Sequence, residues 1–143
     1  MTPQRVSLIT LGVADLDRSR AFYGRLGWTP VPSPPEVVFY QLDGSVLGLF
    51  GLEPLAKDQG REGAELGTGA VSLAQNFPDP AAVDQAFARA IEAGASPLKT
   101  PEKVFWGGYS GYYADPDGHV WEVAHNPFWD IDETGRIAIP VAP

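Results

Sequence analysis

The sequence contains the same order of predicted elements twice, and this repetition limits the folds open to the chain. In each half, an apolar strand leads into a helix that starts at an aspartate. The first half begins with a predicted strand at Val6–Val13 and a helix capped by Asp15. The second half begins with a predicted strand at Ala70–Phe77 and a helix capped by Asp79. The pattern therefore predicts two copies of one unit, with a period of roughly 65–75 residues.

An Asp-Gly pair follows each helix and predicts a hairpin turn. The flanking strands are predicted at Val37–Leu42 and Val46–Phe50 in the first half, and at Gly111–Ala114 and Val120–Ala124 in the second. A further short strand is predicted at Ala95–Leu98. Each half thus has a strand, a helix and then about three strands.

Two stretches have no regular pattern. The proline-rich stretch Thr29–Pro35 is predicted to be irregular. The stretch Leu52–Gly69 is polar, glycine-rich and aperiodic, which favours a linker or mobile loop. We expect one domain over residues 1–143, with repeat one at about 4–55, a linker at about 56–68, repeat two at about 69–127 and a C-terminal tail at 128–143.

Composition excludes several functions. The chain has no cysteine, so disulfides, thiolate nucleophiles and cysteine-based zinc sites are absent. The formal net charge of −8 disfavours nucleic-acid binding and favours cationic ligands. No apolar run is long enough for a bilayer, and the N-terminus lacks a signal-like pattern, so we expect no membrane partner and a cytoplasmic location. Gly-rich phosphate loops, GxSxG elbows and HExxH helices are also missing.

The richest segment is Phe105–Pro127, FWGGYSGYYADPDGHVWEVAHNP, which gathers aromatic residues around one turn. With SLITLGVADLDRSRAFYGRLGW near the N-terminus, it resembles the vicinal oxygen chelate superfamily, which includes glyoxalase I, bleomycin-resistance proteins and extradiol dioxygenases. The resemblance extends from about Val6 to Pro127. It implies an α+β fold in which two βαβββ repeats form a curved mixed sheet around a cavity. It also implies a homodimer, a common assembly in this family.

Metal-dependent members of that family carry four ligands, two from each repeat. The resemblance places these positions at Leu8, Gly48, Ser72 and Glu122. Leu and Gly have no side-chain donor, Ser is a poor ligand, and a single carboxylate does not hold a divalent metal. We therefore expect no metal site and no cofactor. A one-residue shift of the alignment would instead bring Gln75 or Thr10 into play.

Glu122 has more than one predicted role. Facing a cavity, it could act as a general base or as an anion for a cationic ligand; alternatively, a tyrosine or arginine could hold it as a structural carboxylate. His119 and His125 each lie three residues from Glu122, which places them on the opposite face of a regular strand. His119 is interpreted as a surface turn residue. For His125, a hydrogen bond at the strand end and a role in the site both stay open.

Aromatic residues suggest a pocket for a planar, hydrophobic or cationic molecule. The predicted ligand-binding residues are Phe39, Phe50, Trp106, Tyr109, Tyr112, Glu122 and His125. The first hypothesis is a metal-free protein that sequesters a hydrophobic, aromatic or cationic compound, such as an antibiotic. The alternative is a glyoxalase-like lyase or isomerase, or a dioxygenase, with a divalent metal or a catalytic general base at Glu122. A third hypothesis, a structural or partner-binding protein, leaves the aromatic loop unexplained.

Overall fold

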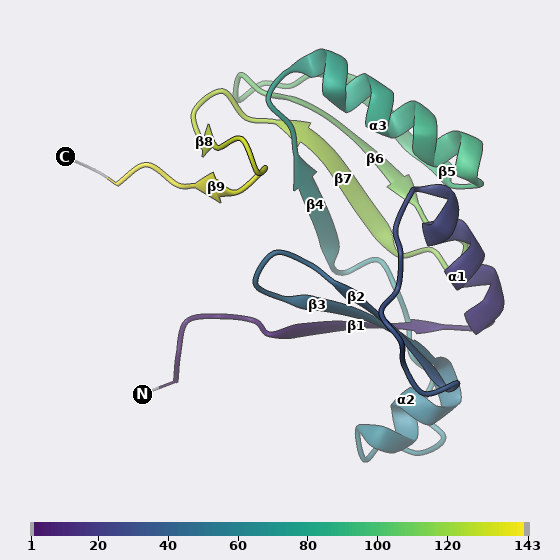
Figure 1. Ribbon diagram of the computed structural model, residues 1–143. Helices are drawn as coiled ribbons and strands as arrows, with labels where there is room; N and C mark the ends of the chain where they lie inside the picture. The colour runs from purple at the N-terminus through teal and green to yellow at the C-terminus, as the bar shows by residue number, and fades with distance from the viewer. Residues whose placement is uncertain (1, 142–143) are drawn as a thin grey trace. The chain divides into compact units, whose positions relative to one another are not determined.

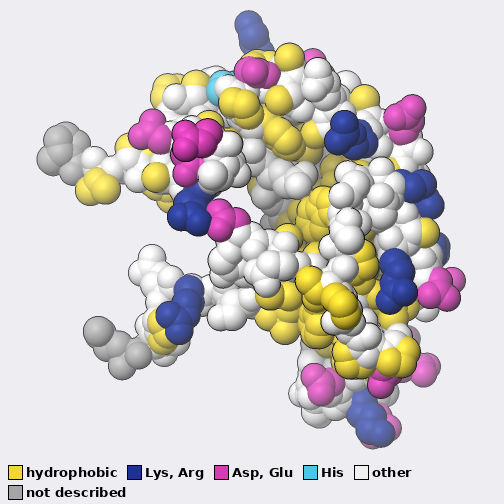
Figure 2. All heavy atoms as spheres, in the orientation of Figure 1, with side chains coloured by type: hydrophobic (Ala, Val, Ile, Leu, Met, Phe, Trp, Pro, Cys, Tyr) yellow, Lys and Arg dark blue, Asp and Glu magenta, His cyan; other side chains and the backbone are white. Residues whose placement is uncertain are grey.

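The computed structural model describes residues 2–141 and has a mixed α+β fold. Two compact units divide the chain, unit 1 over residues 1–67 and unit 2 over residues 68–143. Each unit contains its own mixed β-sheet with a helix on one face (Figure 1). Acidic and basic side chains are interspersed over the face drawn in Figure 2, so the negative charge does not form a single acidic patch on this face.

Unit 1 contains a three-stranded sheet in the order β1-β3-β2. Its elements are β1 (Leu8–Val13), α1 (Leu16–Arg25), β2 (Val37–Gln41), β3 (Val46–Gly51) and α2 (Leu52–Asp58). Strand β1 runs parallel to β3, and β2 is antiparallel to it. The carboxylate of Asp15 accepts a hydrogen bond from the amide of Arg18, which confirms the predicted start of α1.

Alternation along the strands of unit 1 determines which side chains reach the core. Leu47, Leu49 and Tyr40 are buried on the face covered by α1. The ring of Tyr40 lies 6.0 Å from that of Tyr23 on α1, centroid to centroid. Phe39 and its cross-strand partner Gly48 lie on the opposite face, which α2 covers only at the Gly12 end and which we call the open face of unit 1.

Unit 2 contains a four-stranded sheet in the order β4-β7-β6-β5, followed by a short hairpin. Its elements are β4 (Ser72–Asn76), α3 (Pro80–Ala93), β5 (Ser96–Lys103), β6 (Tyr109–Ala114), β7 (Val120–His125), β8 (Asp130–Ile131) and β9 (Ile137–Ala138). Strand β4 is parallel to β7, and the remaining neighbours in the four-stranded sheet are antiparallel. Asp79 caps α3 by accepting from the amide of Ala82 at 2.8 Å, and Gly94 ends the helix in the left-handed conformation, both as predicted.

The core of unit 2 lies between α3 and one face of this sheet. Val83 and Ala90 of α3 are fully buried, and Tyr113, Trp121 and Val123 are buried in the sheet. Cross-strand partners share a face, so Tyr113 and Trp121 lie together on the α3 side. We call the opposite face, which carries Tyr112 and Glu122, the open face of unit 2.

The structure corrects the prediction of an irregular stretch at Leu52–Gly69, because its first part is the helix α2. Leu55 and Ala56 are buried, and the side chains of Leu52 and Leu55 pack closely over Gly12 of β1. A Cβ at Gly12 would approach the Leu52 side chain to 2.8 Å, so these leucines lie directly over a glycine far away in the sequence. This tertiary contact stabilises a short helix that its own sequence would not.

Three further boundaries differ from the prediction. Strand β5 extends to Lys103, well beyond the predicted Ala95–Leu98. The tail contains the β8–β9 hairpin. In unit 1, only two strands follow α1, and Val31 makes a single bridge to Phe39 in place of a third strand. The prolines around Val31 explain this, because proline cannot donate to a strand ladder.

Within residues 2–141, no helix is both long and apolar enough to cross a bilayer.

Candidate functional site

A row of three polar side chains crosses the open face of unit 2 on neighbouring strands. Lys99 of β5 is the cross-strand partner of Tyr112 on β6, and Tyr112 is the partner of Glu122 on β7. Partners in register share a face of the sheet, so a cation, a phenol and a carboxylate follow one another. We call Lys99, Tyr112 and Glu122 the polar row.

The side chain of Tyr112 lies beside that of Glu122 and interacts with it through the charge of the carboxylate and, as the smaller contribution, a hydrogen bond. Because the carboxylate only accepts when ionised, the phenol is the donor. Burial raises the pKa of Tyr112 above its usual value, and the charge of Glu122 and this hydrogen bond raise it further. Tyr112 therefore keeps its proton at neutral pH and acts as a donor fixed in direction.

A cavity of about 370 Å³ lies over the polar row. All three residues of the row line it, together with Glu102, Trp106 and Ser110. Lys99 also forms an ion pair with Glu102, with 3.4 Å between Nζ and Oε1. Both side chains are substantially exposed to solvent, and exposed pairs of this kind contribute little to stability. The cavity thus has a polar floor and an aromatic side.

A tight turn between β5 and β6 places Trp106 beside this cavity. The amide of Val104 donates to the carbonyl of Gly108, and the amide of Gly107 donates to the carbonyl of Val104, both at 3.0 Å. A Cβ at Gly108 would overlap the indole ring of Trp106, so the ring lies directly against this glycine. Gly107 has a φ of 98°, which favours glycine, and Phe128 packs against it.

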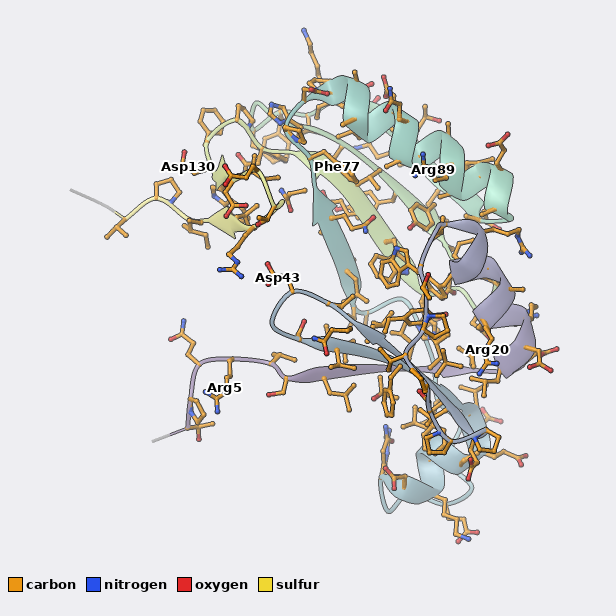
Figure 3. The ribbon with its side chains drawn as sticks, viewed as in Figure 1. Arg5, Arg20, Asp43, Phe77, Arg89 and Asp130 are labelled. Atoms are coloured by element: carbon orange, nitrogen blue, oxygen red, sulfur yellow. The ribbon has the colours of Figure 1, made fainter. Side chains whose placement is uncertain are left out.

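Tyr109 and His125 lie on the other face of the sheet, the side of α3. They are cross-strand partners of each other. The hydroxyl of Tyr109 donates to Asp84 on α3 at 2.7 Å. Nδ1 of His125 lies 3.0 Å from the carbonyl oxygen of Phe77, just after β4 (Figure 3), and must donate, because a carbonyl only accepts. The predicted separation of Glu122 and His125 onto opposite faces is therefore found.

The open face of unit 1 is apolar. A cavity of about 330 Å³ is lined by Leu8, Val31, Phe39, Gln41 and Val46. The predicted ligand-binding residue Phe39 is thus at this cavity. Phe50 is half-buried toward the other end of the same face, opposite Gly12 and Val37.

The four positions implied for metal ligands do not fit a metal. In unit 1 the space beside Gly48 is filled, because a Cβ there would lie 3.2 Å from the ring of Phe39 and 3.5 Å from the side chain of Leu8. In unit 2, Ser72 and Glu122 share the open face, but Gln75 pairs with Val123 and faces α3. Within residues 2–141, no cluster of three or more His, Asp or Glu side chains has metal-binding geometry. Of the four implied positions, only Glu122 offers a carboxylate, and a single carboxylate does not hold a divalent metal.

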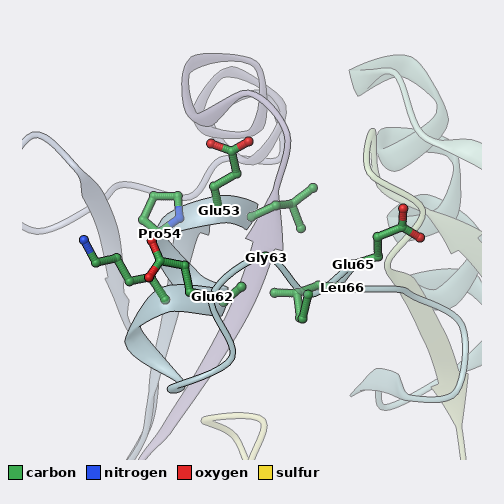
Figure 4. Close-up of a pocket in the computed structure, with 10 residues that line it drawn as sticks. Glu53, Pro54, Glu62, Gly63, Glu65 and Leu66 are labelled. Atoms are coloured by element: carbon green, nitrogen blue, oxygen red, sulfur yellow. The ribbon is translucent and has the colours of Figure 1, made fainter.

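Unit 1 also has a larger groove of about 920 Å³ between α2 and the segment that follows it. Three carboxylates line this groove, from Glu53, Glu62 and Glu65 (Figure 4). They project in different directions in this view and do not converge on one point. We assign no site to this groove.

Sequence reasoning missed six residues that line the cavity in unit 2, namely Lys99, Glu102, Lys103, Val104, Phe105 and Ser110. The first three lie in the part of β5 that was not predicted as a strand. A register shift between Pro97 and Lys99 pairs Lys99 with Tyr112, whereas regular extension of the predicted strand would have paired Leu98 with Tyr112. Ser110 and Glu102 are likewise cross-strand partners on this face.

The fold defines the class of the protein. It is an α+β protein made of two related units, and in each unit the first strand runs parallel to the last strand of the main sheet, β1 to β3 and β4 to β7. The family model described as "Glyoxalase/Bleomycin resistance protein/Dioxygenase superfamily" matches residues 5–123. The chain belongs to this superfamily, which confirms the family and fold expected from the two motifs.

Solved structures give the same result. A "glyoxalase-related enzyme" from Fulvimarina pelagi is 38% identical with a TM-score of 0.90, over 97% of this chain and 100% of that chain. A lactoylglutathione lyase from Agrobacterium tumefaciens is 25% identical with a TM-score of 0.67, over 88% and 96%. A glyoxalase/bleomycin resistance protein from Albidiferax ferrireducens T118 is 26% identical with a TM-score of 0.66, over 85% and 98%. No curated protein matches the sequence.

Proposed function

We propose that this protein binds a small hydrophobic or aromatic molecule without a metal and without converting it. The observation that carries the proposal is the packing of Phe39 and Leu8 into the space beside Gly48. This packing replaces a side chain that would have to be a ligand in a metal-dependent relative. It turns the open face of unit 1 into an apolar surface suited to hydrocarbon or ring contacts.

The cavity in unit 2 supports the same proposal. Its volume of about 370 Å³ suits a small organic ligand. Trp106 offers a ring for stacking, and the Tyr112–Glu122 pair offers a directed polar contact. An antibiotic-like compound has this combination of ring and polar groups. The cytoplasmic location and the pairing of two copies belong to the same proposal, and the native mass in solution tests the pairing.

A ligand screen with paired metal analysis tests this function. Purified chain, prepared without chelators or a histidine tag, is analysed for metals and then titrated with aromatic and cationic antibiotics by calorimetry. We expect saturable binding that is unchanged by added Zn²⁺, Ni²⁺, Mn²⁺ or Fe²⁺. Stoichiometric metal in the purified protein, or the absence of binding by every compound, would contradict the proposal.

Phe39 gives the sharpest variant for this test. Phe39→Ala empties the space beside Gly48 and removes the apolar wall of the unit 1 cavity, so affinity for ring compounds should fall if that cavity binds them. Ile139→Ala is a control, because Ile139 is an exposed apolar side chain in unit 2 that lines neither the unit 1 nor the unit 2 cavity. An equal loss of affinity in both variants would argue against a specific role for the open face of unit 1.

A second candidate is an enzyme with Glu122 as a general base. It is favoured by the position of the Glu122 carboxylate in the lining of the unit 2 cavity, where it can accept a proton from a bound molecule, and by the likeness to the glyoxalase-related enzyme of Fulvimarina pelagi. Glu122→Gln separates the two functions. It would abolish turnover of a substrate but would leave the binding of a purely apolar ligand nearly unchanged.

A further inference from the structure

The polar row specifies the chemistry of the ligand more closely than the fold does. Its charges are ordered across the sheet, with Lys99 at one side and Glu122 at the other. Neighbouring strands lie roughly 4.8 Å apart, so the backbones of these two residues are about 10 Å apart. Tyr112 lies between them and already satisfies one side of Glu122.

Both ends of the row have unused hydrogen-bonding capacity. An ionised carboxylate accepts about four hydrogen bonds, and Tyr112 supplies one to Glu122. The ammonium group of Lys99 has three donors. Its contact with Glu102 is 3.4 Å long and exposed, so an incoming anion can displace it at little cost. The row can thus receive an anion at Lys99 and a donor at Glu122.

The space between the two ends favours an aromatic body. Trp106 borders the same cavity, and its ring lies against Gly108. A planar molecule with one or two rings fits the volume of about 370 Å³. Such a molecule can also contact the ring of Tyr112 in the floor of the cavity.

We propose that the cavity in unit 2 binds an aromatic compound that carries an anionic group at one end and a hydrogen-bond donor at the other. Lys99 binds the anionic group, Glu122 accepts from the donor, and Trp106 packs on the ring. This inference rests on the proposed small-molecule binding and specifies its ligand class. The net charge of −8 repels anions at long range, but at ordinary ionic strength that field is screened beyond about 10 Å.

Three naphthalene probes test the inference on the full chain by calorimetry. Hydroxynaphthoate, with the two groups at opposite ends, has both the anion and the donor, naphthoate has only the anion, and naphthol has only the donor. We expect hydroxynaphthoate to bind at least about fivefold more tightly than either single-group probe. Lys99→Met should lower the affinity for hydroxynaphthoate and naphthoate about tenfold and leave that for naphthol unchanged. Glu122→Gln should lower the affinity for hydroxynaphthoate and naphthol and leave that for naphthoate unchanged.

Arg89→Met is the control, because Arg89 is an exposed cation on α3 (Figure 3), the helix on the other face of the sheet. It should change no affinity, and circular dichroism verifies that each variant is folded. If all three probes bind equally, or if Lys99→Met weakens naphthol as much as naphthoate, the ligand class is wrong although small-molecule binding stands. If no probe and no compound of the antibiotic panel binds, the proposed function itself fails.

Discussion

Gly111 lies at the closest approach of β5 to β6, beside the polar row, and offers a stringent test of the structure. A Cβ at this position would lie 2.8 Å from the carbonyl oxygen of Lys99 and equally close to the backbone nitrogen and ring of Pro101. Non-bonded carbon contacts normally start at about 3.5 Å. Backbone atoms cannot rotate away as a side chain can, so Gly111→Ala must push the two strands apart.

The expected cost follows from two opposing effects. Overpacking of a well-ordered region costs about 1–3 kcal/mol. Replacing glycine by alanine lowers the entropy of the unfolded chain and returns about 0.4–1 kcal/mol. The middle of the first range less the middle of the second gives a net loss of about 1.3 kcal/mol for Gly111→Ala, which shifts the urea midpoint by roughly 0.6 M at a denaturant dependence of about 2 kcal/mol/M.

Urea unfolding followed by circular dichroism measures this loss. Gly24→Ala is the matched control, because Gly24 lies within α1 and a Cβ there would meet no atom within 4 Å. Alanine is the better helix former, so this control should gain about 0.5–1 kcal/mol. A Gly111→Ala variant as stable as the parent would refute the close approach of β5 to β6, and with it the alignment of Lys99 with Tyr112.

Three further predictions concern single side chains. Asp79→Ala removes the cap of α3 and should lower the free energy of unfolding by about 1 kcal/mol, whereas Asp79→Asn should preserve it in the same urea assay. The hydroxyl of Tyr40 is buried and has no hydrogen-bond partner among the described residues, so Tyr40→Phe should raise the free energy of unfolding by about 1 kcal/mol. A lower free energy of unfolding would indicate that the hydroxyl has a partner. Glu122→Gln should lower the pKa of Tyr112, measured by tyrosinate absorbance against Tyr112→Phe, but not to the ordinary value of 10.0, because burial is the largest cause of its elevation. An unchanged pKa would argue against the hydrogen bond between them.

Elements with local signals could be predicted from the sequence. The starts of α1 and α3 are set by Asp15 and Asp79, whose carboxylates accept from amides in the first turn. Alternation along β7 correctly separated Glu122 from His125. The helix starts and the faces of β7 depend only on residues close together in the chain, so the local sequence is enough to predict them.

Elements that depend on distant contacts could not be predicted. Helix α2 packs Leu52 and Leu55 over Gly12, which lies some 40 residues earlier in the chain. Strand β5 contains Pro97 and Pro101, which disfavour a strand except at a sheet edge, and β5 is the edge strand of unit 2. Strand β6 begins at Tyr109, so Tyr109 and Tyr112 belong to one strand. Because they are three residues apart, their side chains lie on opposite faces, and Tyr109 faces α3, where its hydroxyl donates to Asp84.

The two units have kept one backbone plan and lost the likeness of their open faces. Leu8 pairs with Val46, two residues before Gly48, and Ser72 pairs with Val120, two residues before Glu122. The register is thus the same in both units, so Gly48 and Glu122 occupy equivalent positions.

At the first of these positions a phenylalanine ring fills the space of the missing side chain, and at the second a tyrosine holds the carboxylate. Neither position therefore offers, within its own unit, the set of donors that a divalent metal needs. The open face of unit 1 offers apolar contacts and that of unit 2 offers polar ones, which is why we place binding before metal chemistry in this member of the superfamily.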